Sequence, residues 1–413
     1  MMTNATLSTL LWSTLALAVL LLVAVVWLGI AHQRLRRAKA DGAEGRDSEF
    51  ENHSADSADA GRLVAVVVNP TKDSSDSVVR QVHSACSRAG MPEPLVMATS
   101  AEDPGHEMTR RALEAGAVVV IAAGGDGTVR AVAAELAGTD TALGIVPLGT
   151  GNLFARNIGL PFQDLSACVD EAIHGRSHQV DTLDLVLERA DGQTEEEISL
   201  VIAGGGLDAE VMGDTREALK QRAGWLAYGE SGLRHIMGTR SAVTAQFDDG
   251  EAQSYRVRSV LLANCGSLQA GMLLVPSAEF DDGHMDAVLF TPRHALDWVR
   301  IMAKTVTRFA ADIPVMTVRQ AKQAKITMEE PMPFQIDGDA VGEVISVSGT
   351  VNAHALKVNG VTVRRIQELD EKESQTDSGT ESLSETESLS ETESDSPQAA
   401  RIEEGRITKQ KTA

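Results

Sequence analysis

The chain has 413 residues, 43% of them hydrophobic, which leaves room for about two globular domains and flanking segments. Its formal net charge is −22, and only 3% of its residues are aromatic. A nucleic-acid-binding protein needs a basic face to neutralise phosphates, so this composition argues against nucleic acid as a partner.

An uncharged stretch at residues 7–31 is dominated by Leu, Val and Ala. As a helix, its 25 residues measure about 37 Å, more than a hydrocarbon layer of about 30 Å. Four basic residues follow at 34–39 and none precedes the stretch. A cleaved signal peptide would begin with basic residues and fits less well. The positive-inside rule thus predicts a single-pass cell-membrane protein, with a transmembrane anchor and basic flank over residues 1–40 and a cytoplasmic remainder.

Acidic segments lie on both sides of the middle of the chain. Residues 41–61 contain seven acidic residues and one arginine among Ser, Ala and Gly. Residues 368–413 include the polar repeat Thr-Glu-Ser-Leu-Ser-Glu, which begins at 380 and again at 386. Neither segment can bury enough apolar surface to offset chain entropy, so we expect a disordered linker and a disordered tail. The three cysteines are far apart and predict neither a disulfide framework nor a zinc site.

Apolar runs predict an α/β domain over residues 62–180. Residues 62–68 begin with Arg62 and continue as an unbroken apolar run, which is typical of a strand buried on both faces. The next predicted elements are a helix over 78–89, strands over 117–122 and 142–146, and a helix over 129–136 between those strands. Strands that alternate with helices at this spacing predict a parallel sheet.

Short strand-like runs predominate after residue 180, and we expect a mainly antiparallel β-rich domain over residues 181–367. The runs are 182–187, 198–202, 242–247, 256–263, 287–290, 324–328 and 344–347, with a helix over 296–309.

Two glycine-rich loops each lead from a predicted strand into a helix. The first is Gly124-Gly125-Asp126-Gly127-Thr128, and the second is Pro-Leu-Gly-Thr-Gly-Asn over residues 147–152. Glycines at such turns let backbone N–H groups approach an anion, and a helix N-terminus adds positive charge. Asp126 can hold Mg²⁺ directly or through water, and Thr128 can bind phosphate or cap the helix. Loops on consecutive parallel strands open at the same sheet edge, so the pair predicts a nucleotide site.

These motifs together resemble the catalytic domain of diacylglycerol kinases and their relatives, which include sphingosine kinases. The resemblance spans about residues 63–367 and implies an α/β nucleotide-binding domain, a β-rich second domain and ATP in the cleft between them. NAD kinases share the first loop but lack the second motif. In the family the first strand ends in Asn-Pro-x-Ser-Gly, whereas this chain has Asn-Pro-Thr-Lys-Asp from residue 69, so Lys72 is expected to meet phosphate by charge. The implied nucleotide-binding residues are Asn69, Pro70, Thr71, Lys72, Thr99, Gly124, Gly125, Asp126, Gly127, Thr128, Thr150, Gly151 and Asn152.

An Asp-Gly-Asp sequence at residues 337–339 resembles the family's Asp-Gly-Glu, in which the acid after glycine accepts the proton. The resemblance implies that Asp339 is the base and that Asp337 orients it or shares its metal, with Asp126 as the third catalytic acid. Between two strand-like runs the same sequence is also an ordinary turn.

Residues 276–286 resemble a family segment that holds a structural Mg²⁺. The resemblance implies that the Asp282 side chain and the carbonyl groups of Glu279 and His284 bind the ion. A metal-free acidic turn is the alternative. Residues 204–208 resemble an element that lines the cleft, although Asp208 could equally be a helix N-cap.

The sequence therefore predicts an ATP- and Mg²⁺-dependent kinase that phosphorylates a membrane lipid, with diacylglycerol as the expected acceptor and phosphatidic acid as the product. A sphingoid-base or other lipid kinase, an NAD-kinase-like enzyme and a non-catalytic nucleotide or lipid sensor are the alternatives. The sequence leaves open whether the chain forms a homodimer.

Overall fold

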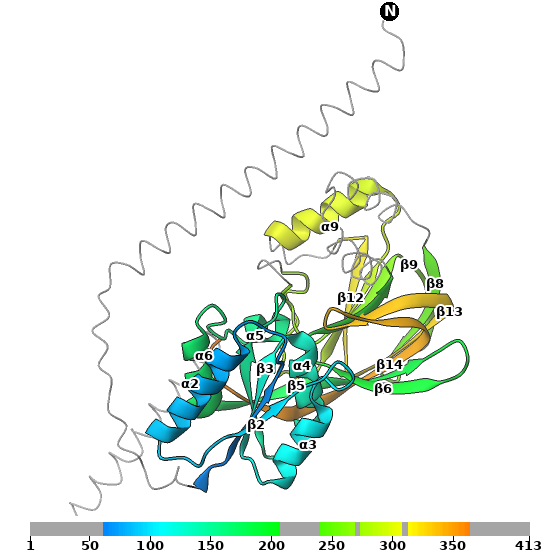
Figure 1. Cartoon of the computed structure of the whole chain (residues 1–413). Coiled ribbons are helices and arrows are strands. Elements are labelled where there is room, and N and C mark those ends of the chain that lie inside the picture. The colour runs from blue at the N-terminus through cyan, green and yellow to red at the C-terminus, as the bar shows by residue number, and fades with distance from the viewer. Residues whose placement is uncertain (1–60, 207–239, 269–272, 308–312, 364–413) are drawn as a thin grey trace, which may run out of the picture. The chain divides into compact units, whose positions relative to one another are not determined.

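The computed structural model describes residues 61–206, 240–268, 273–307 and 313–363 (Figure 1). The predicted anchor, most of the acidic linker, the acidic tail and Asp208 lie outside these residues. In chain order the first elements are β1 (Val64–Val68), α2 (Ser75–Arg88), β2 (Leu95–Ala98), α3 (His106–Glu114), β3 (Val119–Gly124), α4 (Asp126–Leu136), β4 (Ala142–Pro147), α5 (Leu153–Asn157) and α6 (Leu165–His174). The later elements are β5 (Ser177–Glu188), β6 (Thr194–Ser199), β7 (Ile202–Gly206), β8 (Ser241–Phe247), β9 (Gln253–Val257), β10 (Ser259–Ala263), β11 (Met285–Phe290), α9 (Ala295–Thr307), β12 (Met316–Ala321), β13 (Gln323–Ile336) and β14 (Asp339–Asn359).

The first part is the predicted parallel α/β structure. β1 pairs in parallel with β2 on one side and β3 on the other, and β3 pairs in parallel with β4. Side chains of β1 alternate between two hydrophobic clusters because successive residues of a strand point to opposite faces. Helix α2 contributes Val78 and Val82 to one cluster, and α3 and α4 contribute Ala112 and Val132 to the other. Both faces of β1 are therefore buried, as predicted.

The second part is β-rich and mainly antiparallel, as predicted. β13 pairs with β14, β7 and β8, and β14 also pairs with β5 along most of its length. The far end of β14 lies parallel to β4, with Val358 opposite Leu143. This contact joins the parallel and antiparallel strands, so the described strands form one continuous sheet. The predicted domain boundary at residue 180 falls inside β5.

Two of the predicted strands are each divided in the structure. The run 198–202 contains the end of β6 and the start of β7, and the run 256–263 contains the end of β9 and all of β10. Both breaks are buried, since Leu200 and Val201 are 1% exposed and Arg258 is 8% exposed. Leu200 and Val201 are apolar as well as buried, so hydrophobicity does not reveal the first break.

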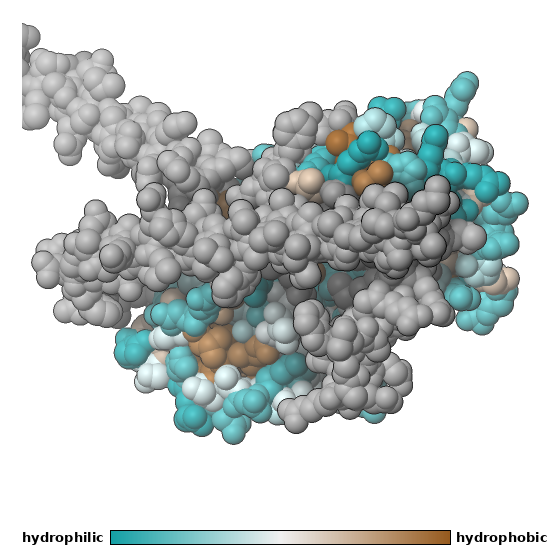
Figure 2. Space-filling view, turned by 90° about the horizontal axis from the view of Figure 1, so that it is seen from above, coloured by the Kyte–Doolittle hydropathy of each residue, from teal (hydrophilic) through white to brown (hydrophobic). Residues whose placement is uncertain are grey.

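None of the helices in the described ranges is both long and apolar enough to span a bilayer. The longest of them, α2, has 14 residues and measures about 21 Å, short of a hydrocarbon layer of about 30 Å. This finding contradicts the predicted single-pass membrane location, which rested on residues 7–31, outside the described part of the chain. Hydrophilic residues predominate on the described surface visible in Figure 2, and apolar residues gather there in separate small areas.

Candidate active site

The strand order places a crevice at the carboxyl ends of β1 and β3. In the order β4-β3-β1-β2, the chain leaves β1 toward β2 and then crosses back to β3 on the other side of β1. Loops that leave such a switch point in opposite directions leave a gap between them, where α/β proteins bind ligands. The Asn69 N–H donates to the Ala123 carbonyl over 2.9 Å, so the two loops begin side by side.

The loop after β1 is shaped by Asn69 rather than by glycine. The Asn69 side-chain oxygen accepts hydrogen bonds from the Thr71 N–H at 3.0 Å and from the Thr71 hydroxyl at 2.7 Å. The Ser75 hydroxyl donates to the Asn69 carbonyl at 2.6 Å. These bonds lead the chain directly into α2, whose N-cap residue Ser74 makes no side-chain capping bond. The loop therefore keeps a fixed turn although it lacks the Ser-Gly of the family motif.

The two glycine-rich loops contact each other backbone to backbone. A Cβ on Gly149 would lie 2.8 Å from the Gly125 Cα, and the Leu148 N–H donates to the Gly124 carbonyl at 2.7 Å. A Cβ on Gly124 would lie 2.5 Å from the Thr128 side chain, which is buried. Glycine is required at these positions because neighbouring atoms occupy the space of a side chain.

Asp126 joins the first loop to the second. Its carboxylate accepts hydrogen bonds from the N–H groups of Asn152 and Leu153, at 2.9 and 2.6 Å. Burial raises the pKa of the Asp126 carboxyl, and the charges of Asp337 and Asp339 raise it further, against the effect of these hydrogen bonds. Both oxygens of Asp126 thus bind the start of α5, a positioning role that spacing alone did not indicate.

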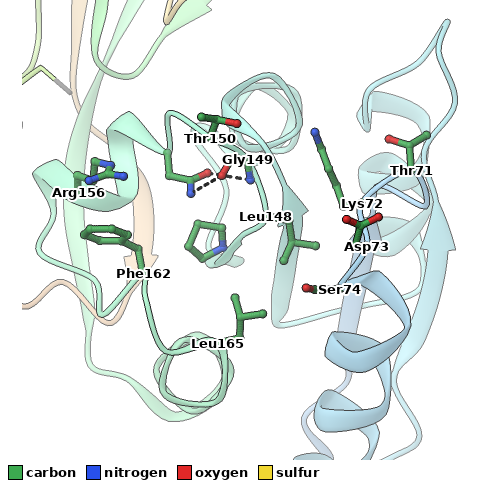
Figure 3. A pocket seen from close by; sticks show the side chains of 12 residues that line it. Thr71, Lys72, Asp73, Ser74, Leu148, Gly149, Thr150, Arg156, Phe162 and Leu165 are labelled. Carbon is green, nitrogen blue, oxygen red and sulfur yellow. Dashed lines mark hydrogen bonds between the residues drawn. The ribbon is translucent and has the colours of Figure 1, made fainter. Parts of the chain in front are cut away.

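A cleft of about 450 Å³ opens between the loop after β1 and the loop after β4 (Figure 3). Lys72 extends into it from one side, and on the other side the Arg156 guanidinium lies 4.0 Å from the centre of the Phe162 ring. Asp73 is the single carboxylate among the described residues that line the cleft. The lining residues are Thr71, Lys72, Asp73, Ser74, Pro147, Leu148, Gly149, Thr150, Asn152, Arg156, Phe162 and Leu165.

Four of the thirteen predicted nucleotide-binding residues line the cleft, and the others are not among its lining residues. Thr71, Lys72, Thr150 and Asn152 line the cleft directly. The first glycine loop lies behind the second, in contact through Gly125 and Gly149. Thr99 is buried at the end of β2, where its N–H donates to the Val68 carbonyl at 2.9 Å.

The two acids of the Asp-Gly-Asp turn between β13 and β14 have different surroundings. Asp337 is 4% exposed, and its carboxylate accepts four hydrogen bonds of 2.7–3.0 Å from the turn between β6 and β7. The donors are the Ser199 hydroxyl and the N–H groups of Leu200, Val201 and Ile202. The Asp337 carboxylate is the acceptor for all four of these donors, so Asp337 supports the turn from within the protein.

Asp339 instead faces the first glycine loop and helix α4. A Cβ on Gly127 would lie 2.9 Å from Asp339 Oδ2, and Arg130 Nη2 lies 3.6 Å from the same oxygen. Arg130 Nη1 also donates to the Ile336 carbonyl at 2.6 Å. The fold therefore brings Asp339 to the predicted nucleotide loops across about two hundred residues of chain. Sequence reasoning missed Arg130, although its position three residues after Gly127 places both on one helix face.

The segment predicted to hold Mg²⁺ is a closely hydrogen-bonded turn. Asp282 Oδ1 accepts from the His284 N–H at 2.9 Å, and Oδ2 accepts from the Gln320 side chain at 3.1 Å. His284 Nδ1 lies 2.8 Å from the Asp282 carbonyl oxygen. Within the described ranges, no three His, Cys, Asp or Glu side chains are grouped so as to hold a metal. A site built from one carboxylate and two carbonyl groups, including that of Glu279, stays a prediction.

Comparisons with known proteins show the family to which the chain belongs. The model of the diacylglycerol kinase catalytic domain matches residues 63–185, and that of the YegS C-terminal NAD kinase beta sandwich-like domain matches residues 200–360. The diacylglycerol kinases of Bacillus subtilis and Staphylococcus carnosus are each 27% identical to the chain. The alignments cover 67% and 68% of this chain and 89% of each relative.

Two crystal structures from Bacillus anthracis show the same fold. Their TM-scores are 0.57 and 0.52, at 18% and 17% identity, and the second is described as a diacylglycerol kinase. Each match covers 74% of this chain, and 98% and 97% of the solved chains. With both domain models matched in order, the chain belongs to the diacylglycerol kinase catalytic-domain family and is a lipid kinase.

Proposed function

We propose that this lipid kinase transfers the γ-phosphoryl group of ATP to the hydroxyl of diacylglycerol. The observation that carries the proposal is the placement of Asp339 against Gly127, which brings an acid of the β-rich part to the glycine loops of the α/β part. The names of the aligned relatives support diacylglycerol as the acceptor, because the alignments cover 89% of each relative.

The cleft fits a nucleotide in size and in chemistry. Its volume of about 450 Å³ lies within the range of about 300–1,000 Å³ for small-molecule sites. Lys72 and the N-terminus of α2 offer positive charge to phosphates. The apolar side chains of Leu148, Phe162 and Leu165 offer a surface against which the nucleotide base can pack. We therefore assign the phosphates to the gap between the loops after β1 and β4.

The residues also fit a magnesium ion carried by the nucleotide. Mg²⁺ is commonly held by one or two carboxylates together with substrate phosphates and water, so a cluster of three acids is not required. Asp73 would supply that carboxylate, with the Ser74 hydroxyl beside it in the cleft. When bound, the ion would neutralise charge that develops on the phosphates.

The chain's own residues position the reactants and accept a proton. Lys72 and Thr150 bind phosphate oxygens, and Asp126 holds the second glycine loop in place through the N–H groups of Asn152 and Leu153. Asp339 accepts the proton of the lipid hydroxyl as the hydroxyl oxygen bonds to the γ-phosphorus. The bond from that phosphorus to the bridging oxygen breaks, and ADP leaves. In this proposal residues 62–180 bind the nucleotide and residues 181–367 supply the base.

The test is phosphate transfer from labelled ATP by the full chain, with Mg²⁺ and mixed micelles that contain diacylglycerol, sphingosine or neither. We expect labelled phosphatidic acid from diacylglycerol, and a loss of about 10²–10⁴-fold in Asp339→Asn, the usual contribution of a general base. Glu330→Gln removes an exposed carboxylate from β13 and is the matched control. Label found only in the sphingosine product would show that sphingosine, and not diacylglycerol, is the acceptor. Full activity of Asp339→Asn would refute the assignment of Asp339 as the base.

A further inference from the structure

Arg130 occupies a central position between the α/β part and the β-rich part. It lies in the first half of α4, and its side chain is 14% exposed. Nη1 donates to the Ile336 carbonyl at 2.6 Å, just before the Asp-Gly-Asp turn, and Nη2 lies 3.6 Å from Asp339, just after it. One planar guanidinium therefore contacts the turn on both sides.

The charge around this guanidinium is strongly negative. Asp126, Asp337 and Asp339 are close enough that the latter two raise the pKa of Asp126. Arg130 also interacts with Glu197 of β6: burial raises the pKa of the Glu197 carboxyl, and the charge of Arg130 lowers it. Carboxylates this close repel one another, and a nearby cation offsets that repulsion. Arg130 supplies such a cation, in contact with Asp339.

We propose that Arg130 is a positioning residue for phosphoryl transfer, which holds the Asp339 carboxylate over Gly127 in the orientation that accepts the proton of the lipid hydroxyl. The inference rests on the proposed function, because it takes Asp339 as the base. A group held within the productive geometry saves the cost of orienting it, and a misplacement of about 1 Å can cost about 10²-fold in rate.

The two contacts explain why arginine rather than lysine suits this position. The Ile336 carbonyl and the Asp339 carboxylate are met by different nitrogens of one rigid fork. A lysine ammonium keeps the charge but concentrates it on one nitrogen, so it cannot reproduce both contacts in the same geometry. Arg130→Lys should therefore recover part of the rate that Arg130→Gln loses.

The competing explanation is that Arg130 is only a structural link between the α/β part and the β-rich part. The kinetic pattern distinguishes these two explanations. If Arg130 positions Asp339, Arg130→Gln lowers kcat by about 10–100-fold. The KM for ATP, and ATP affinity measured by calorimetry, change by less than about twofold because Arg130 is not among the residues that line the nucleotide cleft. A structural link alone would alter ATP affinity and the unfolding midpoint, and lysine would give no selective recovery of kcat.

The experiment compares Arg130→Gln, Arg130→Lys, Asp339→Asn and the double variant Arg130→Gln/Asp339→Asn in the full chain. Because an arginine that acts through Asp339 has nothing to position once that carboxylate is gone, we expect the double variant to be no more than about threefold slower than Asp339→Asn. Arg110→Gln is the matched control, since Arg110 pairs with Glu135 at 3.3 Å outside the cleft.

Two results would overturn the inference. One is a wild-type kcat in Arg130→Gln. The other is a double variant in which the fold-losses in kcat of the two single variants multiply. If Arg130→Gln does not fold, Arg130→Lys and its double variant with Asp339→Asn decide the same question. These outcomes differ from failure of the proposed function, in which the wild-type chain itself transfers no phosphate to any lipid.

Discussion

The replacement Asp337→Asn tests whether the two acids of the Asp-Gly-Asp turn have separate roles. Asp337 Oδ1 accepts from the Ser199 hydroxyl and from the N–H groups of Val201 and Ile202, and Oδ2 accepts from the Leu200 N–H. An asparagine keeps the shape but can place its oxygen at only one of these positions. Its NH₂ group then faces the Leu200 N–H, donor against donor.

The magnitude follows from these contacts. A hydrogen bond to a charged group contributes about 1.5–3 kcal/mol, and the three remaining bonds weaken when the acceptor becomes neutral. We expect a loss of about 2–4 kcal/mol, which at about 2–4 °C per kcal/mol lowers the melting temperature by roughly 4–16 °C. The Asp337 backbone is left-handed, with φ of 50°. Asparagine tolerates that conformation, so the loss reports the hydrogen bonds and not strain.

The assay combines urea unfolding at 25 °C with transfer kinetics at a temperature where every variant is folded. Asp337→Asn should have a clearly lower urea midpoint of unfolding. It should retain a kcat within about tenfold of wild type, since Asp337 supports the turn and does not itself accept the proton. Asp339→Asn should show the reverse pattern, with wild-type stability and a loss of about 10²–10⁴-fold in kcat. A wild-type urea midpoint in Asp337→Asn, together with lost transfer, would refute this reasoning and make Asp337 the base.

Four further predictions use single sites. Gly127→Ala places a Cβ 2.9 Å from Asp339 Oδ2, so it should lower kcat by about tenfold or more without lowering the urea midpoint, because a side-chain end can move aside; an unchanged kcat would contradict the placement of the base. Burial raises the folded-state pKa of Asp126, so the stability advantage of wild type over Asp126→Asn should shrink as pH rises from about 4 to about 7 in urea titrations, and a growing advantage would contradict it. Asp73→Ala should weaken MgATP binding in calorimetry and raise the Mg²⁺ concentration at half saturation, whereas tighter ATP binding both with Mg²⁺ and with EDTA would show that Asp73 only repels phosphate. Gly144→Ala puts a Cβ 2.8 Å from the Ala172 Cβ between β4 and α6, and should cost about 1–3 kcal/mol in urea unfolding while folded molecules keep wild-type kcat.

Local patterns in the chain were sufficient to identify the α/β part. Residues 63–68 are apolar without interruption. β1 is buried on both faces, because a central parallel strand contacts helices on either side. The glycine loops at residues 124–128 and 147–152 were identified for a similar reason. Backbones can approach as closely as Gly125 and Gly149 do only where no Cβ intervenes, and that requirement is visible in the residue type.

Tertiary contacts decided the roles of the acids. Asp337 and Asp339 differ by two positions and share a residue type, yet one meets the β6–β7 turn and the other meets α4. Asp126 looked like a metal ligand beside glycines, whereas in the fold it binds the start of α5. Arg130 carried no motif and reaches the Ile336 carbonyl from 206 residues away. Residue type and spacing report conformational need and burial along the chain, but the partner of a polar side chain depends on which distant segments the sheet brings together.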